Sequence, residues 1–351
     1  MSNPAYKEII SAVPQEKLDL FLTTANRLGA PIGNIEKDFW VCWTLDALYH
    51  ARPAGGPRLL FKGGTSLSKS FGLIERFSED IDVTVFRDDL DEPASVEELE
   101  ALSNKKRRAR LDAIRNACRG YITGPLRAFL TEHLAEATDG RGRVEIDEAD
   151  PDGQTLLVWY PEVEPRVEAY VRPAVRIESG AKSALDPNSP KDIRPYVADD
   201  LAGLDLTVSG VTTIDAERTF WDKLVIAHGL RRWFERRGEL RQEGQRISRH
   251  FYDLHCLFAS GIGRAAIADT ALGVDCVHHA LMFFNRPDYD LASAVTGSFA
   301  ITPTAAMIDA LARDYANMTP MIFGDAPPFE EIMASMTEIE RLANSAGLAI
   351  S

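Results

Sequence analysis

The chain has 351 residues, of which 45% are hydrophobic and 26% are charged, and its net charge is −14. This composition is typical of a globular protein, and the length suggests two domains or one large one. No apolar run reaches the roughly 18 residues that a membrane span needs, and the first residues lack the pattern of a signal peptide. We therefore expect a cytoplasmic protein with no membrane partner.

The charge and the cysteines exclude two further classes of protein. A chain this acidic does not coat nucleic acid over its whole surface, so any polyanion must bind a local basic patch. Two such patches occur, at residues 105–110 and 231–249. The four cysteines are scattered without a Cys-x-x-Cys pair, which argues against a disulfide framework or a structural zinc site.

The first 90 residues predict two helices followed by two strands. Residues 15–29 and 35–50 have apolar residues at helical spacing. Residues 58–62 form a short apolar run and residues 81–85 alternate, and both patterns predict strands. Between the strands, Gly63-Gly64 turns the chain and a short helix is expected from Thr65 to Gly72.

The rest of the chain divides into a mixed part and a helical part. Helices are expected within residues 93–137, and strands near 142–147, 154–160, 167–178 and 204–208. From Asp215 onward the pattern is helical, at residues 215–237, 247–260, 263–284, 303–316 and 328–346. We therefore predict an α+β core over residues 1–213, followed by a helical domain over residues 214–351.

The most informative stretch is the glycine turn between the first two strands. Glycine lets the backbone approach a triphosphate closely, and a helix that begins there presents free N–H groups and a positive dipole end. Thr65 and Ser66 can add hydroxyl donors, and Lys69, one turn into the helix, can reach a phosphate. Taken alone, a Gly-Gly pair is usually only a tight turn.

Two aspartates follow on the next predicted strand. Asp80 and Asp82 are two residues apart, so their side chains share one face of the strand. The two carboxylates repel each other unless a cation sits between them, and magnesium takes carboxylate and phosphate oxygens together. A lone Asp-x-Asp is often only a solvated strand edge. The glycine turn and the aspartates in this order favour a nucleotidyl-transfer site with two metal ligands.

Four motifs in this order resemble one known family. They are KGGTSLSK at residues 62–69 with RFSEDID at 76–82, EKDFWVCW at 36–43, ERTFWDKL at 217–224 and RHFYDL at 249–254. They resemble the AbiEii/AbiGii (MenT-like) nucleotidyltransferase toxins of the DNA polymerase β-type superfamily. The resemblance covers about residues 35–258, and the C-terminal helices carry no motif of this kind.

The resemblance implies a polymerase β-like nucleotidyltransferase core and a type IV toxin–antitoxin or abortive-infection role. It implies that Lys223 contacts the triphosphate, that Asp253 completes the catalytic site, and that an antitoxin is encoded alongside. Members of the family bind GTP or add nucleotides to the 3′ acceptor end of tRNA. A third metal carboxylate is expected from a later strand, and Glu178 is the candidate, with Arg176 on the same face. A strand-edge Glu–Arg pair remains the alternative.

The residues themselves agree with part of this. Lys223 is flanked by apolar residues, so its amine needs a phosphate or carboxylate partner unless it extends to water. Asp253 lies among aromatic residues and has two possible roles. It is either a base with a raised pKa or a partner that orients Arg249 or Lys223. Arginines beside Trp233 in the run at 231–249 suit RNA, although a solvated helix end explains them too.

These observations predict an enzyme that transfers nucleotides from an NTP to a tRNA 3′ end and so blocks translation and growth. Asp80 and Asp82, with Glu178, hold Mg²⁺ (or Mn²⁺), and the glycine turn and Lys223 bind the nucleotide. One alternative keeps the site but uses a protein acceptor. Another is a non-catalytic protein that binds GTP or a partner.

Overall fold

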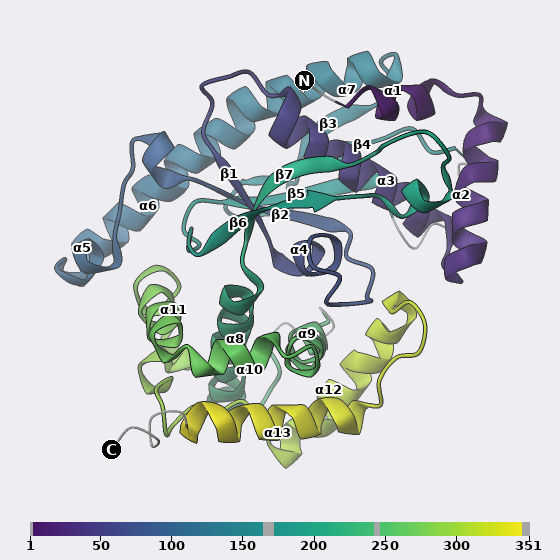
Figure 1. The fold of residues 1–351 in the computed structure, drawn as a ribbon. Coiled ribbons are helices and arrows are strands. Elements are labelled where there is room, and N and C mark those ends of the chain that lie inside the picture. The colour runs from purple at the N-terminus through teal and green to yellow at the C-terminus, as the bar shows by residue number, and fades with distance from the viewer. Residues whose placement is uncertain (1–2, 164–171, 242–245, 346–351) are drawn as a thin grey trace. The chain divides into compact units, whose positions relative to one another are not determined.

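The computed structural model describes residues 3–163, 172–241 and 246–345 (Figure 1). The chain divides into two compact units, and the second begins at Asp215. Two short segments from earlier in the chain, Phe71–Arg76 and Val96–Ala101, also belong to the second unit. The periodicity predicts one boundary after residue 213 and gives no sign that these two segments pack with the C-terminal helices.

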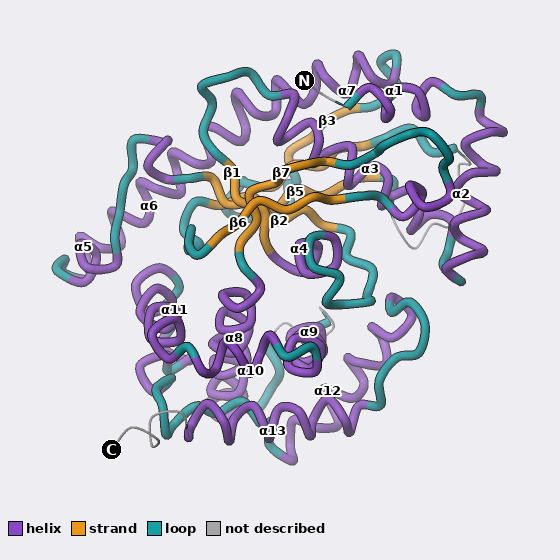
Figure 2. Tube along the Cα trace, viewed as in Figure 1, coloured by secondary structure: helices purple, strands orange, loops and turns teal. Residues whose placement is uncertain are grey.

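The first unit contains a mixed seven-stranded sheet in the order β3-β4-β5-β2-β1-β7-β6 (Figure 2). The β2–β5 and β1–β7 pairs are parallel and the other pairs are antiparallel. The strands are β1 Leu59–Lys62, β2 Asp80–Val85, β3 Arg143–Ile146, β4 Thr155–Trp159, β5 Ala174–Gly180, β6 Asn188–Ile193 and β7 Val208–Ile214. The predicted α+β class with a mixed sheet and C-terminal helices is confirmed.

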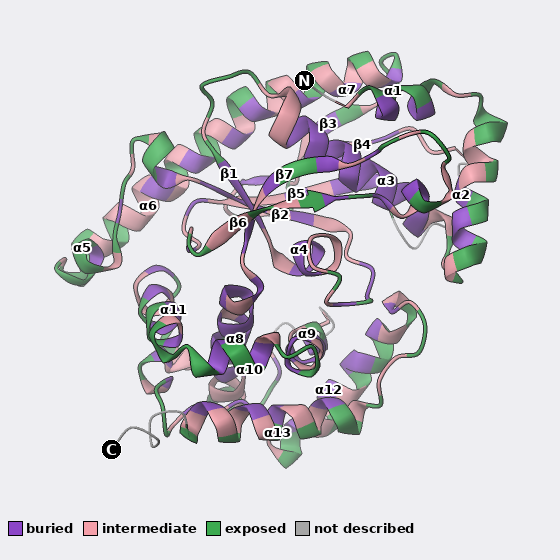
Figure 3. Ribbon diagram, viewed as in Figure 1, coloured by how far each residue is buried: buried purple, intermediate pink, exposed green. Residues whose placement is uncertain are grey.

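Helices of the first unit pack on this sheet or on one another. They are α1 Pro4–Ser11, α2 Pro14–Leu28, α3 Ile32–Asp46, α4 Gly63–Lys69, α6 Asn104–Tyr121 and α7 Arg127–Thr138. Helix α3 contacts β2, β5 and β7, and it is buried on nearly every side (Figure 3). Trp43 of α3 stacks on His133 of α7 with 5.3 Å between the ring centroids. The central strands, which carry the candidate carboxylates, therefore have a rigid support.

Between residues 179 and 213, one strand prediction was wrong and one strand was missed. The strand expected at Leu204–Val208 begins only where that range ends, as β7. Strand β6 was missed because it contains Pro190, which lacks the N–H group of a ladder hydrogen bond. Since β6 lies at the edge of the sheet, its outer side needs no such donor. Of the strand expected at 167–178, residues 167–171 lie outside the described residues.

The second unit is helical in its described residues from Asp215 onward. Its helices are α5 Val96–Glu100, α8 Ala216–Arg237, α9 Ser248–Ala259, α10 Ile262–Ala268, α11 Thr270–Phe283, α12 Ala305–Met318 and α13 Phe329–Ser345. Helix α8 packs against α9, α10 and α11. The single helix expected at 263–284 is two helices, because the Asp269 side chain accepts a hydrogen bond from Leu272 N (3.0 Å) and starts α11. None of the helices in the described parts of the chain is long and apolar enough to cross a membrane.

Candidate active site

The glycine turn and the second aspartate are in direct contact. Helix α4 begins at Gly63, immediately after β1, and not at Thr65 as expected. Gly63 has φ +80°, and a Cβ atom there would lie 2.0 Å from Asp82 Oδ2. Only glycine fits this position, both for its backbone conformation and for the space beside Asp82. The turn therefore sets where the Asp82 carboxylate lies.

The hydroxyl groups that follow the turn have partners within the chain. Thr65 is fully buried, and its Oγ1 donates to the backbone oxygen of Asp80 and lies 2.9 Å from Ser78 Oγ. Ser66 is also fully buried, and its Oγ donates to Gly63 O at 2.9 Å. Thr65 thus ties α4 to the start of β2, and Ser66 closes the turn. Both hydroxyls therefore stabilise the turn through hydrogen bonds within the chain.

Lys69 has a carboxylate partner in the first unit. Its side chain is 5% exposed, its amine forms an ion pair with Asp38 of α3, and it lies 3.3 Å from the ring centroid of Tyr196. Burial alone lowers the pKa of Lys69, but the Asp38 carboxylate, with smaller contributions from Tyr196 and Cys42, raises it above its usual value. The amine that was expected to reach a phosphate is therefore charged and joins α4 to α3.

Three carboxylates of the central strands influence one another. Asp82 of β2 is the register partner of Glu178 on β5, and Asp80 is the partner of Arg176. Burial, followed by the negative charges of Glu178, Glu79 and Asp82, raises the pKa of Asp80 to about 7. This is the electrostatic strain that a bound cation would relieve.

Glu178 already has a cationic partner. Its carboxylate accepts a hydrogen bond from Arg176, which also donates to Asp147 Oδ2 at 3.0 Å. Within the residues that the structure describes, no group of three or more His, Cys, Asp or Glu side chains is arranged to hold a metal ion. Asp80 and Asp82 therefore form the two-carboxylate part of the predicted site, and Glu178 is held by Arg176.

Lys37 is a neighbour of this cluster that the sequence analysis missed. It lies on α3 with a side chain only 4% exposed, and its amine is 2.7 Å from Glu79 Oε2. Its positive charge partly offsets the rise in the pKa of Asp80. The available signal was its place in the motif at residues 36–43, directly beside the buried Asp38.

The two later motifs meet in the second unit at Asp253. This side chain is fully buried, and Arg76 donates to both of its oxygens at 2.8 and 2.9 Å. The Lys223 amine is 2.8 Å from Asp253 Oδ2. Burial alone would raise the pKa of Asp253, but the positive charges of Arg76 and Lys223 outweigh it and lower the pKa. The structure thus favours the orienting role of Asp253 over the role of a base.

Arg76 is the residue of this second cluster that sequence reasoning did not single out. It is 6% exposed, and it stands at the start of the motif at residues 76–82. Burial lowers the pKa of Lys223, and Arg76 adds to this effect while Asp253 opposes it. The Asp253 carboxylate is thus the group that favours the charged form of Lys223 against burial.

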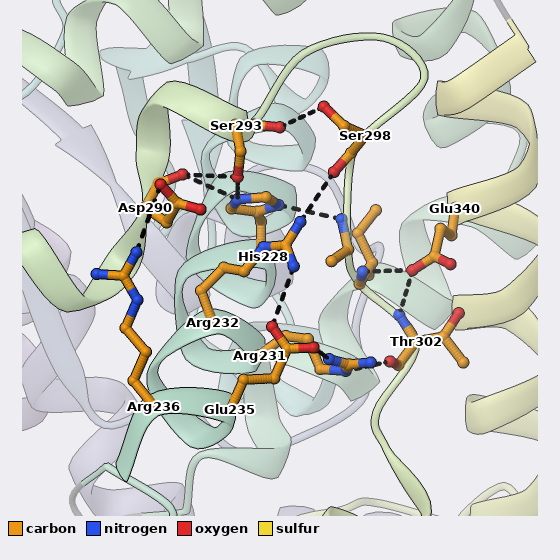
Figure 4. A network of polar contacts seen from close by, with 12 residues as sticks. His228, Arg231, Arg232, Glu235, Arg236, Asp290, Ser293, Ser298, Thr302 and Glu340 are labelled. Carbon is orange, nitrogen blue, oxygen red and sulfur yellow. Dashed lines mark hydrogen bonds and ion pairs between the residues drawn. The ribbon is translucent and has the colours of Figure 1, made fainter.

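The arginines at the end of α8 have internal partners (Figure 4). Their contacts are Arg231 with Glu235 and Thr302 O (2.9 Å), Arg232 with Glu235 (3.0 Å), Arg236 with Asp290 (3.6 Å), and Arg237 with Asp288 (2.6 Å). These contacts hold the segment around residues 288–302 against the helix. The four arginines, which were expected to suit RNA, thus serve the packing of the second unit.

Comparisons with known proteins place this chain in a family. Residues 46–335 match the family described as "Nucleotidyl transferase AbiEii toxin, Type IV TA system". Among solved structures, MenT4, the nucleotidyltransferase toxin Rv2826c from Mycobacterium tuberculosis H37Rv, is 18% identical with a TM-score of 0.39, covering 93% of this chain and 98% of that one. No curated protein matches the chain. The family match spans most of the sequence and includes both carboxylate clusters, so the chain belongs to the AbiEii nucleotidyltransferase toxins of type IV toxin–antitoxin systems.

Proposed function

We propose that this toxin transfers a nucleotide from an NTP to the 3′ acceptor end of tRNA and thereby blocks translation and growth. Membership of the family supports nucleotidyl transfer, an NTP substrate and an antitoxin partner. The observation that carries the assignment of the site is the raised pKa of Asp80, beside Asp82 and the glycine turn. Such a concentration of negative charge suits a site that binds a cation together with phosphates.

The residues fit a magnesium or manganese ion in part. Asp80 and Asp82 offer the carboxylate oxygens that such a hard cation prefers. Glu178 is the third candidate ligand, although its carboxylate is held by Arg176 here. When bound, the ion supplies positive charge beside the phosphates of the NTP. This charge would also remove the repulsion that raises the pKa of Asp80.

The chain's own residues have separate tasks in this proposal. Gly63 and Gly64 let the backbone approach the triphosphate, and Thr65 and Ser66 hold that turn in shape. Lys69 fixes α4 to α3 through Asp38. Lys223 of the second unit, held by Asp253, is the residue for which the family resemblance predicts contact with the nucleotide. An acceptor hydroxyl attacks the α-phosphate, and pyrophosphate leaves.

Incubation with total tRNA, magnesium and each of the four α-labelled NTPs tests this proposal. We expect label on RNA with at least one nucleotide, and its loss in Asp80→Ala. The matched control is Asp19→Ala, which removes an exposed acid of α2 in the same unit. Label that appears on protein and not on RNA would contradict the tRNA acceptor. Tight NTP binding without release of pyrophosphate would contradict transfer altogether.

A further inference from the structure

We infer that the first turns of α6 form the surface through which this chain binds the phosphate backbone of RNA. RNA as the partner rests on the proposed function, whereas the assignment of the surface rests on the structure. Of the two basic patches in the sequence, the patch at residues 231–249 has its four arginines on α8 engaged by carboxylates and backbone oxygens, Arg231, Arg232 and Arg236 among them (Figure 4). The patch on α6 differs from it in three respects.

The first respect is that three cationic side chains of the α6 patch are exposed to solvent. Lys105, Lys106 and Arg108 are exposed, and no hydrogen bond or ion pair joins them to any residue that the structure describes. Asp112 is the one acidic residue of α6, and it pairs with Arg115 at 3.1 Å, further along the helix. In a chain of net charge −14, these turns are a local surface of opposite sign.

The second respect is that these positive charges do not stabilise helix α6. Lys105 and Lys106 lie in the first turn of α6, which contains no acidic residue. Positive charge near a helix N-terminus opposes the helix dipole, and like charges three or four residues apart repel each other. Lys105 and Arg108 have that spacing. Residues that destabilise the helix or strand in which they lie are typical of binding sites.

The third respect is that the surface is held firmly within the first unit. Ile114 and Cys118 of α6 are fully buried, and the helix packs against β5, the strand that carries Glu178. Arg110 forms an ion pair with Glu92 and donates to Pro93 O. The exposed cations therefore project from a fixed helix of the unit that contains the candidate metal ligands.

The chemistry of the patch favours RNA over an acidic protein. The exposed residues that flank these cations are small or polar, Asn104 and Ala109, and no aromatic side chain lies in these turns. A protein interface needs an apolar or aromatic centre and is depleted in lysine. Flexible cations without such a centre suit phosphates, whose binding is independent of sequence and falls steeply with salt. The contact is thus to the backbone of the RNA and not to its bases.

The double variant Lys105→Glu with Arg108→Glu tests the inference. The matched control, Lys7→Glu with Arg313→Glu, makes the same change of charge at two exposed positions on α1 and α12. Binding of labelled total tRNA is measured between low and physiological salt. For the α6 variant we expect affinity to fall by about tenfold or more, and the slope of log affinity against log salt to fall by about two. The control should change both much less.

Thermal melting separates binding from folding. Acidic residues near the start of a helix are favourable, so the α6 variant should melt at the same temperature as the native chain or higher. Unchanged affinity and salt slope in a folded α6 variant would overturn the inference. Loss of poly-glutamate binding with unchanged tRNA binding would also overturn it, in favour of an acidic protein partner.

The proposed function and the RNA-binding surface on α6 can each be contradicted without the other. If the native chain binds tRNA through α6 but puts no label on RNA, the proposed function fails and the surface stands. If label reaches RNA equally well in the α6 variant at physiological salt, the function stands and the surface fails.

Discussion

Two aspartates of this chain, one in each unit, occupy opposite electrostatic environments. Burial and three acidic neighbours raise the pKa of Asp80, and Lys37 only partly offsets them. Asp253 is in contact with two cations, Arg76 and Lys223, which lower its pKa. The first carboxylate is therefore only partly compensated within the chain, whereas the second has its counter-charge built in.

This difference distinguishes a carboxylate that is suited to binding a cation from a carboxylate that holds neighbouring side chains in position. A carboxylate whose neighbours repel it is suited to a cation that arrives with the substrate. A buried carboxylate held by two cations holds those cations in place, and it contributes little as a base. Removal of each carboxylate should therefore have opposite consequences for activity and stability.

Asp80→Asn should abolish activity without unfolding the chain. We expect nucleotidyl transfer to fall by on the order of 10²–10³-fold or more, the loss typical for a group that stabilises charge in the transition state. The neutral amide also relieves repulsion with Glu178 and Asp82, so the melting temperature should not fall. Transfer to total tRNA and thermal melting measure the two effects. Full turnover by this variant would remove Asp80 from the mechanism.

Asp253→Asn should chiefly destabilise the second unit. Loss of the carboxylate leaves the buried charges of Arg76 and Lys223 without their partner, which costs about 3–5 kcal/mol. The matched control is Asp89→Asn. Asp89 pairs with Arg58 through two similar hydrogen bonds, but the Arg58 side chain is 63% exposed, so the cost there is about 0–1 kcal/mol. Urea unfolding of both variants checks the difference, and equal costs would contradict the contrast between the two aspartates.

Gly63→Ala should damage the site and the fold together. The backbone at φ +80° costs a non-glycine residue about 1–3 kcal/mol, and the new Cβ would also displace the Asp82 carboxylate. Gly29→Ala is the control, since Gly29 has φ +61° with nothing within 4 Å of an added Cβ. Both variants should lose stability, and only Gly63→Ala should lose transfer activity. Normal turnover by Gly63→Ala would separate the glycine turn from the Asp82 site.

His228 gives the smallest effect, and it concerns the scaffold of the second unit alone. Its Nδ1 accepts a hydrogen bond from Ala300 N at 3.0 Å, and burial lowers its pKa below the ordinary 6.5. Its contribution to stability is therefore complete above pH 6.5 and is lost as the pH falls from there toward its folded pKa, by up to ~1.4 kcal/mol per pH unit.

The melting temperatures of the native chain and of His228→Asn, measured from pH 7.5 to 5.5, test this effect. The difference between them should shrink as the pH falls. A constant difference would show that His228 is not neutral in the folded chain.

Many elements of both units follow from local patterns. The burial of α3, the strands around the glycine turn and the α8 and α9 helices have periodicities that predict them. Strand β6 and the break at Asp269 did not follow, because Pro190 is tolerated only at a sheet edge and a side-chain cap depends on local geometry. Edge position and cap geometry are properties of the folded chain.

By itself, the sequence determined the family, the spacing of Asp80 and Asp82 on one strand face, and the candidates Glu178, Lys223 and Asp253. Spacing along a strand or helix fixes which side chains share a face, and four ordered motifs identify a family. Only the tertiary structure decided which charges meet. It paired Lys69 with Asp38 and Asp253 with Arg76, and it left the cations at the start of α6 exposed. The reason is that electrostatic partners lie far apart in sequence, so the pKa and role of a charged residue depend on neighbours that only folding brings together.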